Sequence, residues 1–232
     1  MYQPPAIYNF PPFYTLQPNS QTKSVQIENW CSIVLNWAES ESVWSTKLDG
    51  TPYTLQSSQD SYELEEDENM DASNRSIETI FENRQLPRKV SSELNREIWR
   101  ALISSSPDCV IPFTNDGSDP KTIHDRYLKQ ISKYKLQNTK SKQQQQQQQQ
   151  QIFAPESKFL LFPKSIDIYA SLLLQSWDDS GVKGSVLTLY EITEYYKELP
   201  INHLSIIVLE VERTGACTVI WEEGRIVGVK VA

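Results

Sequence analysis

The 232-residue sequence predicts a mainly α chain with small β-hairpins, an α+β protein of two tandem winged-helix domains behind an extended proline-rich N-terminal arm. Three observations carry this prediction. Prolines and aromatic residues alternate over residues 1–20. One order of elements, helix, strand, helix, helix and hairpin, then occurs twice. In each occurrence, apolar residues recur at the spacing of helices and strands. They are numerous enough to form a small core.

The predicted arm covers residues 1–20. Its prolines and aromatic residues are Pro4, Pro5, Pro11, Pro12, Pro18, Tyr2, Tyr8, Phe10, Phe13 and Tyr14. Because proline holds the backbone extended and costs little entropy to immobilise, aromatic side chains on such an arm are typical ligands of a hydrophobic groove. That groove belongs either to a partner or to the arm's own domain, and the residues alone leave both open.

Residues 21–163 form the predicted first winged helix. A helix from about Thr22 has apolar residues at three- and four-residue spacing as far as Ala38. Short strands follow from Val43 to Leu55, around the turn at Gly50. These elements are typical of the start of a winged helix.

The next apolar stretch, Ile77 to Leu86, ends at Pro87 and takes the place of a second helix. A further helix begins after Ser91, a suitable cap, and has apolar residues from Leu94 to Leu102 on one face. Residues 109–113 and 158–162 are both apolar and predict a hairpin. Its tip is expanded by a polar and polyglutamine insertion, residues 114–157, which we expect to be a loop.

Charge is distributed unevenly along this first domain. Residues 60–71 contain seven acids and no base, inside a loop that we expect over residues 56–76. Residues 121–142 contain seven bases and one acid and run into the nine glutamines of residues 143–151. Such segments have little apolar surface to bury, so both are predicted to be solvated loops. An acidic docking or phosphorylation site and a nucleic-acid patch are the alternatives.

Residues 164–232 form the predicted second winged helix. Ser165 caps a helix that ends near Gly181. Residues 185–187 form a short strand, and Thr188 with Glu191 forms a capping box that opens a second helix. A third helix begins at Pro200, and residues 217–221 and 226–231 close the domain as a hairpin.

The composition argues against an enzyme. The chain has only 7 Gly, 2 His and 3 Cys, and Cys31, Cys109 and Cys217 lie far apart from one another. We therefore expect no catalytic residue, no cofactor and no metal site. Neither a signal peptide nor a membrane-spanning apolar run is present, so a cytoplasmic protein is expected.

Three stretches carry a family resemblance, namely residues 10–19 (FPPFYTLQPN), residues 30–35 (WCSIVL) and residues 185–193 (SVLTLYEIT). In this order they resemble the small-subunit family of the ESCRT-II complex. The resemblance implies tandem winged helices, two copies per complex and a role at endosomes in sorting ubiquitinated cargo into multivesicular bodies. It implies contact with the membrane only through the complex, and no nucleic acid.

The resemblance also implies partners and sites. The arm would bind the two larger ESCRT-II subunits through Pro11, Pro12, Phe13 and Tyr14. An upstream set, Pro4, Pro5 and Tyr8, departs from a second Pro-Pro-x-Tyr motif by one inserted residue. The second domain would recruit the ESCRT-III subunit that begins filament assembly.

Two alternatives use the same residues differently. A Pro-Pro-x-Tyr motif is also the minimal ligand of WW domains. Winged helices often bind DNA through the third helix, but residues 155–232 contain eleven acids against seven bases, a balance that repels phosphates. In the first domain the candidate DNA contacts are Arg88, Lys89, Arg96 and Arg100. Glu93 and Glu97 lie on the same helix and offset these bases.

Overall fold

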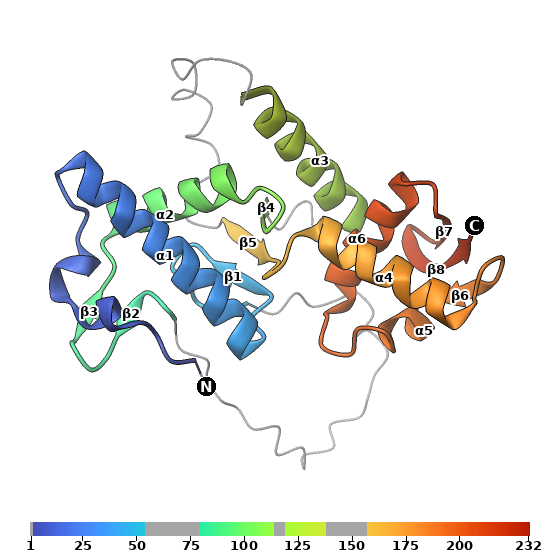
Figure 1. The fold of residues 1–232 in the computed structure, drawn as a ribbon, viewed down its shortest axis with the longest axis horizontal. Coiled ribbons are helices and arrows are strands. Elements are labelled where there is room, and N and C mark those ends of the chain that lie inside the picture. Colours follow the sequence, from blue (N-terminus) through green and yellow to red (C-terminus); the bar gives the residue numbers. More distant parts are fainter. Residues whose placement is uncertain (1, 54–78, 114–118, 138–156) are drawn as a thin grey trace, which may run out of the picture.

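The computed structural model describes residues 2–53, 79–113, 119–137 and 157–232 (Figure 1). The predicted acidic loop 56–76 lies outside these residues. Of the predicted insertion 114–157, residues 119–137 and 157 are described.

The first half contains two of its expected helices and the expected hairpin. Helix α1 (Ser20–Glu41) begins two residues before the predicted start, because the Asn19 side chain accepts hydrogen bonds from the backbone N–H groups of Gln21 and Thr22. Helix α2 (Ser92–Ser105) is capped by Ser91 as predicted. Strands β1 (Ser45–Lys47), β4 (Val110–Phe113) and β5 (Lys158–Leu161) form one antiparallel sheet in the order β1-β5-β4. The predicted β4–β5 hairpin is confirmed, with Phe113 opposite Lys158.

The helix predicted for Ile77 to Leu86 is wrong over its described part. Strands β2 (Glu82–Asn83) and β3 (Arg88–Lys89) form a small hairpin there. The Asn83 side chain accepts hydrogen bonds from the backbone N–H groups of Gln85 and Leu86, at 3.0 and 3.2 Å. These hydrogen bonds stabilise a local turn in place of the hydrogen-bond pattern of a helix.

The loop predicted for residues 114–157 is also wrong over its described part, because helix α3 (Pro120–Gln137) lies within it. Asp119 begins the helix by accepting a hydrogen bond from the Thr122 N–H at 2.9 Å. Ile123 and Tyr127 are buried on the side that faces the second half of the chain. The segment is polar overall, so its apolar stripe was not recognised from the sequence. This stripe packs on α6, about 80 residues further along the chain.

The second half follows its predicted order. Helix α4 (Ile166–Ser180) is capped by Ser165 and ends at Gly181, whose φ is 64°. Strand β6 (Val186–Thr188) leads through the capping box of Thr188 and Glu191 into helix α5 (Leu189–Thr193). Helix α6 (Ile201–Arg213) and strands β7 (Cys217–Glu222) and β8 (Arg225–Val231) follow, in a sheet of order β6-β8-β7.

The two halves lie side by side, with α3 rising between them and its far end extending beyond both (Figure 1). The Leu161 N–H donates to the Trp44 carbonyl at 2.8 Å, and His203 on α6 contacts the same carbonyl at 2.9 Å. Apolar residues of β4 and β5 therefore enter the core of the second half. The predicted α+β class is confirmed. The second half has the element order predicted for a winged helix, whereas the first half has a hairpin in place of the second helix.

Candidate docking site

The arm folds onto its own domain in two short turns. These are the 3₁₀ helices η1 (Ala6–Asn9) and η2 (Pro11–Tyr14), closed by hydrogen bonds such as the Tyr8 N–H to the Pro5 carbonyl at 2.9 Å. The expected extended conformation is therefore wrong for this segment. Proline at the first positions of a turn suits its φ and lacks only an N–H that the turn does not use.

Trp30 of α1 is the centre of the seat that holds the arm. Phe13 stacks on its indole ring with centroids 4.6 Å apart and planes 10° apart. Tyr8 and Tyr14 approach the same ring edge-on, at 5.9 and 5.5 Å. Phe81 completes the cluster at 5.7 Å. Aromatic pairs in these geometries each contribute about 1 kcal/mol beyond the area they bury, so the arm is part of the domain core.

Hydrogen bonds fix the same turns. Trp30 and Gln26 both donate to the Phe13 carbonyl, at 3.0 and 2.8 Å. The Tyr14 hydroxyl donates to the Tyr8 carbonyl at 2.7 Å, and Asn83 donates to that carbonyl at 3.2 Å. Burial raises the pKa of Tyr14, and its hydrogen bonds with Asn83 and Tyr8 offset part of this effect. The side chains face inward because their polar atoms find partners there.

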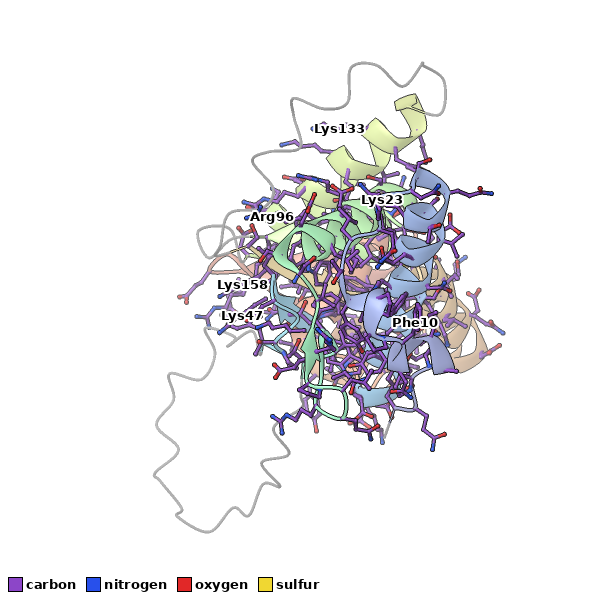
Figure 2. All side chains as sticks on the ribbon, turned by 90° about the vertical axis from the view of Figure 1, so that its left-hand side faces the viewer. Phe10, Lys23, Lys47, Arg96, Lys133 and Lys158 are labelled. Carbon is purple, nitrogen blue, oxygen red and sulfur yellow. The ribbon has the colours of Figure 1, made fainter. Side chains whose placement is uncertain are left out.

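The outer face of the arm is apolar and exposed. Phe10 has 53 % of its surface exposed and Ile7 has 37 %. Pro5, Pro11 and Pro12 are exposed beside them, and Pro4 is half-buried. Figure 2 places Phe10 on the outer side of the arm. Exposed apolar residues gathered on one rigid turn are typical of a protein-docking surface.

The structure thus divides the predicted site residues into two groups. Tyr8, Phe13 and Tyr14 are buried in the seat, whereas Pro11 and Pro12 lie on the outer face. Sequence reasoning placed Trp30 in a core helix but missed Gln26 and Asn83 as partners of the arm. Gln26 lies one helical turn before Trp30 and so on the same face of α1, which was a usable signal; Asn83 offered none.

Helix α6 of the second half is enclosed. Residues His203 to Val211 are all buried, beneath α4 on one side and α3 on the other. This is the third helix of the predicted second winged helix, and in DNA-binding winged helices the third helix reads DNA. Other helices of the chain cover its surface, so α6 cannot enter a DNA groove.

A cluster of His124, Glu210 and Arg213 joins α3 to α6, with the first two side chains buried. The Glu210 carboxylate lies 3.1 Å from His124 Nε2 and accepts hydrogen bonds from the Arg213 guanidinium. Burial by itself raises the pKa of Glu210, but the hydrogen bonds from His124 and Arg213 outweigh it and lower this pKa to about 2. Glu210 is therefore ionised at neutral pH and is satisfied by its partners.

Burial keeps the cysteines and His203 uncharged. Burial raises the pKa of Cys31, Cys109 and Cys217 to about 12, so these thiols stay protonated. Burial lowers the pKa of His203 to about 4, so it is neutral at physiological pH. Among the described residues no three His, Cys, Asp or Glu side chains are grouped to hold a metal ion. In the same residues, no helix combines the length and apolar character that crossing a bilayer requires.

Known proteins resemble this chain over most of its length. The family model for ESCRT-II complex subunits matches residues 7–199. Vacuolar protein-sorting-associated protein 25 of Saccharomyces cerevisiae is 28 % identical over 190 residues, 82 % of this chain and 75 % of the yeast protein. The protein of that name from Danio rerio is 33 % identical over 95 residues, 41 % of each chain.

Solved structures show the same fold. The crystal structure of subunit VPS25 of the endosomal trafficking complex ESCRT-II superposes with a TM-score of 0.66 at 23 % identity, over 99 % of this chain and all of that one. A subunit in the structure of the ESCRT-II endosomal trafficking complex superposes with a TM-score of 0.60 at 21 % identity, over 98 % of both chains. Since the family model spans most of the sequence, the chain belongs to the ESCRT-II complex subunit family.

Proposed function

We propose that this chain is a non-enzymatic subunit of an ESCRT-II complex that binds the two larger subunits through its N-terminal arm. Its second domain recruits the initiating ESCRT-III subunit, so that ubiquitinated cargo is sorted into multivesicular bodies. The chain is cytoplasmic, enters the complex in two copies and reaches endosomes peripherally through it. The observation that carries the proposal is the exposed apolar face of a rigidly seated arm in a member of this family.

The predicted site residues of the arm have two different roles in the proposed binding. Phe13, Tyr14 and Tyr8 hold the arm on Trp30, whereas Pro11 and Pro12 meet the partner together with the exposed Phe10. Pro4 and Pro5 extend this face toward the N-terminus. Because the turns are already ordered before binding, little conformational entropy is lost when a partner covers them.

The second domain supports the other half of the proposal. Val186 and Tyr190 have 60 % and 74 % of their surfaces exposed, on β6 and α5. Tyrosine with an exposed ring is common at the centre of protein interfaces. The buried state of α6 favours protein contact over the alternative of a winged-helix nucleic-acid-binding or transcription-associated factor.

Co-expression with the two larger subunits tests the proposal. Phe10→Ser combined with Pro12→Ala removes exposed apolar contact and leaves the Trp30 seat intact. We expect affinity for the larger subunits to fall roughly 30-fold, about 2 kcal/mol, while the thermal midpoint of the isolated chain is unchanged. Size-exclusion chromatography with light scattering measures assembly and copy number.

Two further variants separate docking from folding. Phe13→Ala is expected to lower both assembly and the thermal midpoint, because it empties the stack on Trp30. Tyr190 is the matched exposed aromatic residue of the second domain. The variant Tyr190→Ser is expected to assemble normally with the larger subunits and to bind ESCRT-III more weakly. Normal assembly of the Phe10 and Pro12 double variant would show that the outer face of the arm is not the docking surface.

A further inference from the structure

Helix α3 is held to the body of the protein along one face. Ile123 and Tyr127 are buried against the second half, and His124 reaches Glu210 of α6. Further along, Gln130 donates to the carbonyls of Pro107 and Val110, at 2.8 and 2.9 Å. The helix is therefore anchored to both halves and cannot turn about its axis.

A second face of α3, about a third of a turn away from the anchored face, is basic. Arg126, Lys129 and Lys133 follow at spacings of three and four residues, which puts them on one side of a helix within about 10 Å of its length. Lys129 and Lys133 are exposed and Arg126 is half-exposed. From residue 126 to the end of the helix no acid occurs. Its anchors therefore present this face outward in one fixed orientation.

Bases of the first half continue this surface. Figure 2 shows Lys133, Arg96 of α2 and Lys47 of β1 pointing toward the same side of the molecule. Arg96 and Lys47 are exposed. Together with Arg126 and Lys129 these residues form a basic margin of five side chains, on a protein whose net charge is −8. Along the two helices the neighbouring exposed acids are Glu93, one turn before Arg96, and Asp125, one turn before Lys129. A partner with complementary charge at this surface is therefore anionic.

The chemistry of the margin favours a lipid surface over a nucleic acid. Binding a single strand needs exposed aromatic rings on which bases stack, whereas Tyr127 of α3 is buried against the second half and Tyr134 is only half-exposed. Reading a duplex needs a helix whose bases are free to enter a groove. In α2, the candidate helix of the first half, Glu97 pairs with Arg100 and with Lys23 of α1, so these bases are engaged within the protein. A flat anionic membrane requires neither, because bases gathered on one side contribute additively near its surface.

We propose that the basic margin formed by Lys47, Arg96, Arg126, Lys129 and Lys133 binds the surface of membranes that contain anionic phospholipid. This goes beyond the proposed function, in which the chain reaches the membrane only through its partners. A single margin of this size binds reversibly, and its contribution adds to every other membrane contact of an assembly that contains the chain.

Vesicle flotation of the purified full chain tests the proposal. We expect binding to vesicles in which about a third of the phosphatidylcholine is replaced by phosphatidylserine, and none to phosphatidylcholine alone. Raising the salt from about 0.1 M to about 0.5 M is expected to release the protein, because exposed charges are screened. Arg126→Ala, Lys129→Ala and Lys133→Ala combined are expected to lower the affinity roughly 100-fold, about fivefold for each base.

A matched variant removes the same charge elsewhere. Lys183→Ala, Lys197→Ala and Lys230→Ala change three exposed lysines of the second domain and are expected to bind vesicles like the unchanged chain. Circular dichroism checks that both triple variants fold. Equal losses from the two variants, or salt-insensitive binding, would overturn the proposal. So would duplex DNA or RNA that binds the margin more tightly than the anionic vesicles do.

Discussion

At the scale of single residues, Gly228 decides whether the sheet of the second half can close. It lies in the central strand β8, opposite Thr188 of β6 and Ile220 of β7. A Cβ at this position would lie 2.4 Å from the Leu187 carbonyl oxygen, a backbone atom that cannot move away without shifting β6. The constraint is steric and comes from a neighbouring strand.

We predict that Gly228→Ala lowers the free energy of unfolding by about 2 kcal/mol, a typical cost of overpacking. Urea unfolding followed by circular dichroism measures it. Thr218→Ala, an exposed change on the same sheet, is expected to stay within about 0.5 kcal/mol. Equal unfolding midpoints for the two variants would mean that β6 has room to move.

At the scale of elements, the contact of α3 with α6 depends on the charge of Glu210. Its pKa is about 2 in the folded chain, below its ordinary value of 4.5. A lowered carboxyl pKa stabilises the fold above pH 4.5, and this contribution is lost as the pH falls toward 2. We expect it to be on the order of 2 kcal/mol, less than the full shift implies, because Arg213 is half-exposed and solvent screens its share.

The variant Glu210→Gln keeps the shape of the side chain and removes its charge. At pH 7 it is predicted to unfold at lower urea concentration than the unchanged chain. Between pH 4.5 and 2 its stability is predicted to change less with pH, since it has no carboxylate to protonate. Parallel pH profiles for the two proteins would show that the cluster of His124, Glu210 and Arg213 does not stabilise the fold.

At the scale of the whole molecule, His203 lies where the two halves meet. It contacts the Trp44 carbonyl at 2.9 Å and packs 4.7 Å from the Phe162 ring. Burial lowers its pKa to about 4, although hydrogen bonds with the backbone of Trp44 and Leu161 act in the opposite direction. The unfolded chain binds a proton at this histidine below about pH 6.5, and the folded chain does so only near pH 4.

Stability is therefore predicted to fall by roughly 3 kcal/mol as the pH drops from above 6.5 to 4. The window from pH 6.5 to 4.5 separates this effect from that of Glu210. His203→Gln retains a donor for Trp44 and carries no titratable group, so its stability is expected to vary less over this window. Thermal midpoints at half-unit pH steps measure both proteins, and identical slopes would contradict the assignment to His203.

Local sequence signals predicted much of the fold. Ser91, Ser165 and the pair Thr188 with Glu191 cap the helices predicted for them, because a cap acts within three or four residues of the chain. The β4–β5 hairpin was predicted across its long insertion from two apolar runs, since an apolar strand needs a pairing partner wherever the chain provides one. Periodicity, capping and turn chemistry are all properties of short stretches.

What the sequence alone determined about this protein is its α+β class, the order of the helices and strands in its second half and the motif that points to its family. Only the tertiary structure decided that Phe13 and Tyr14 pack on Trp30 and that a polar insertion contains a helix with a basic outer face. The physical reason is the same in both cases. An apolar side chain is buried against whichever surface reaches it, and for the arm and for α3 that surface comes from residues distant in sequence.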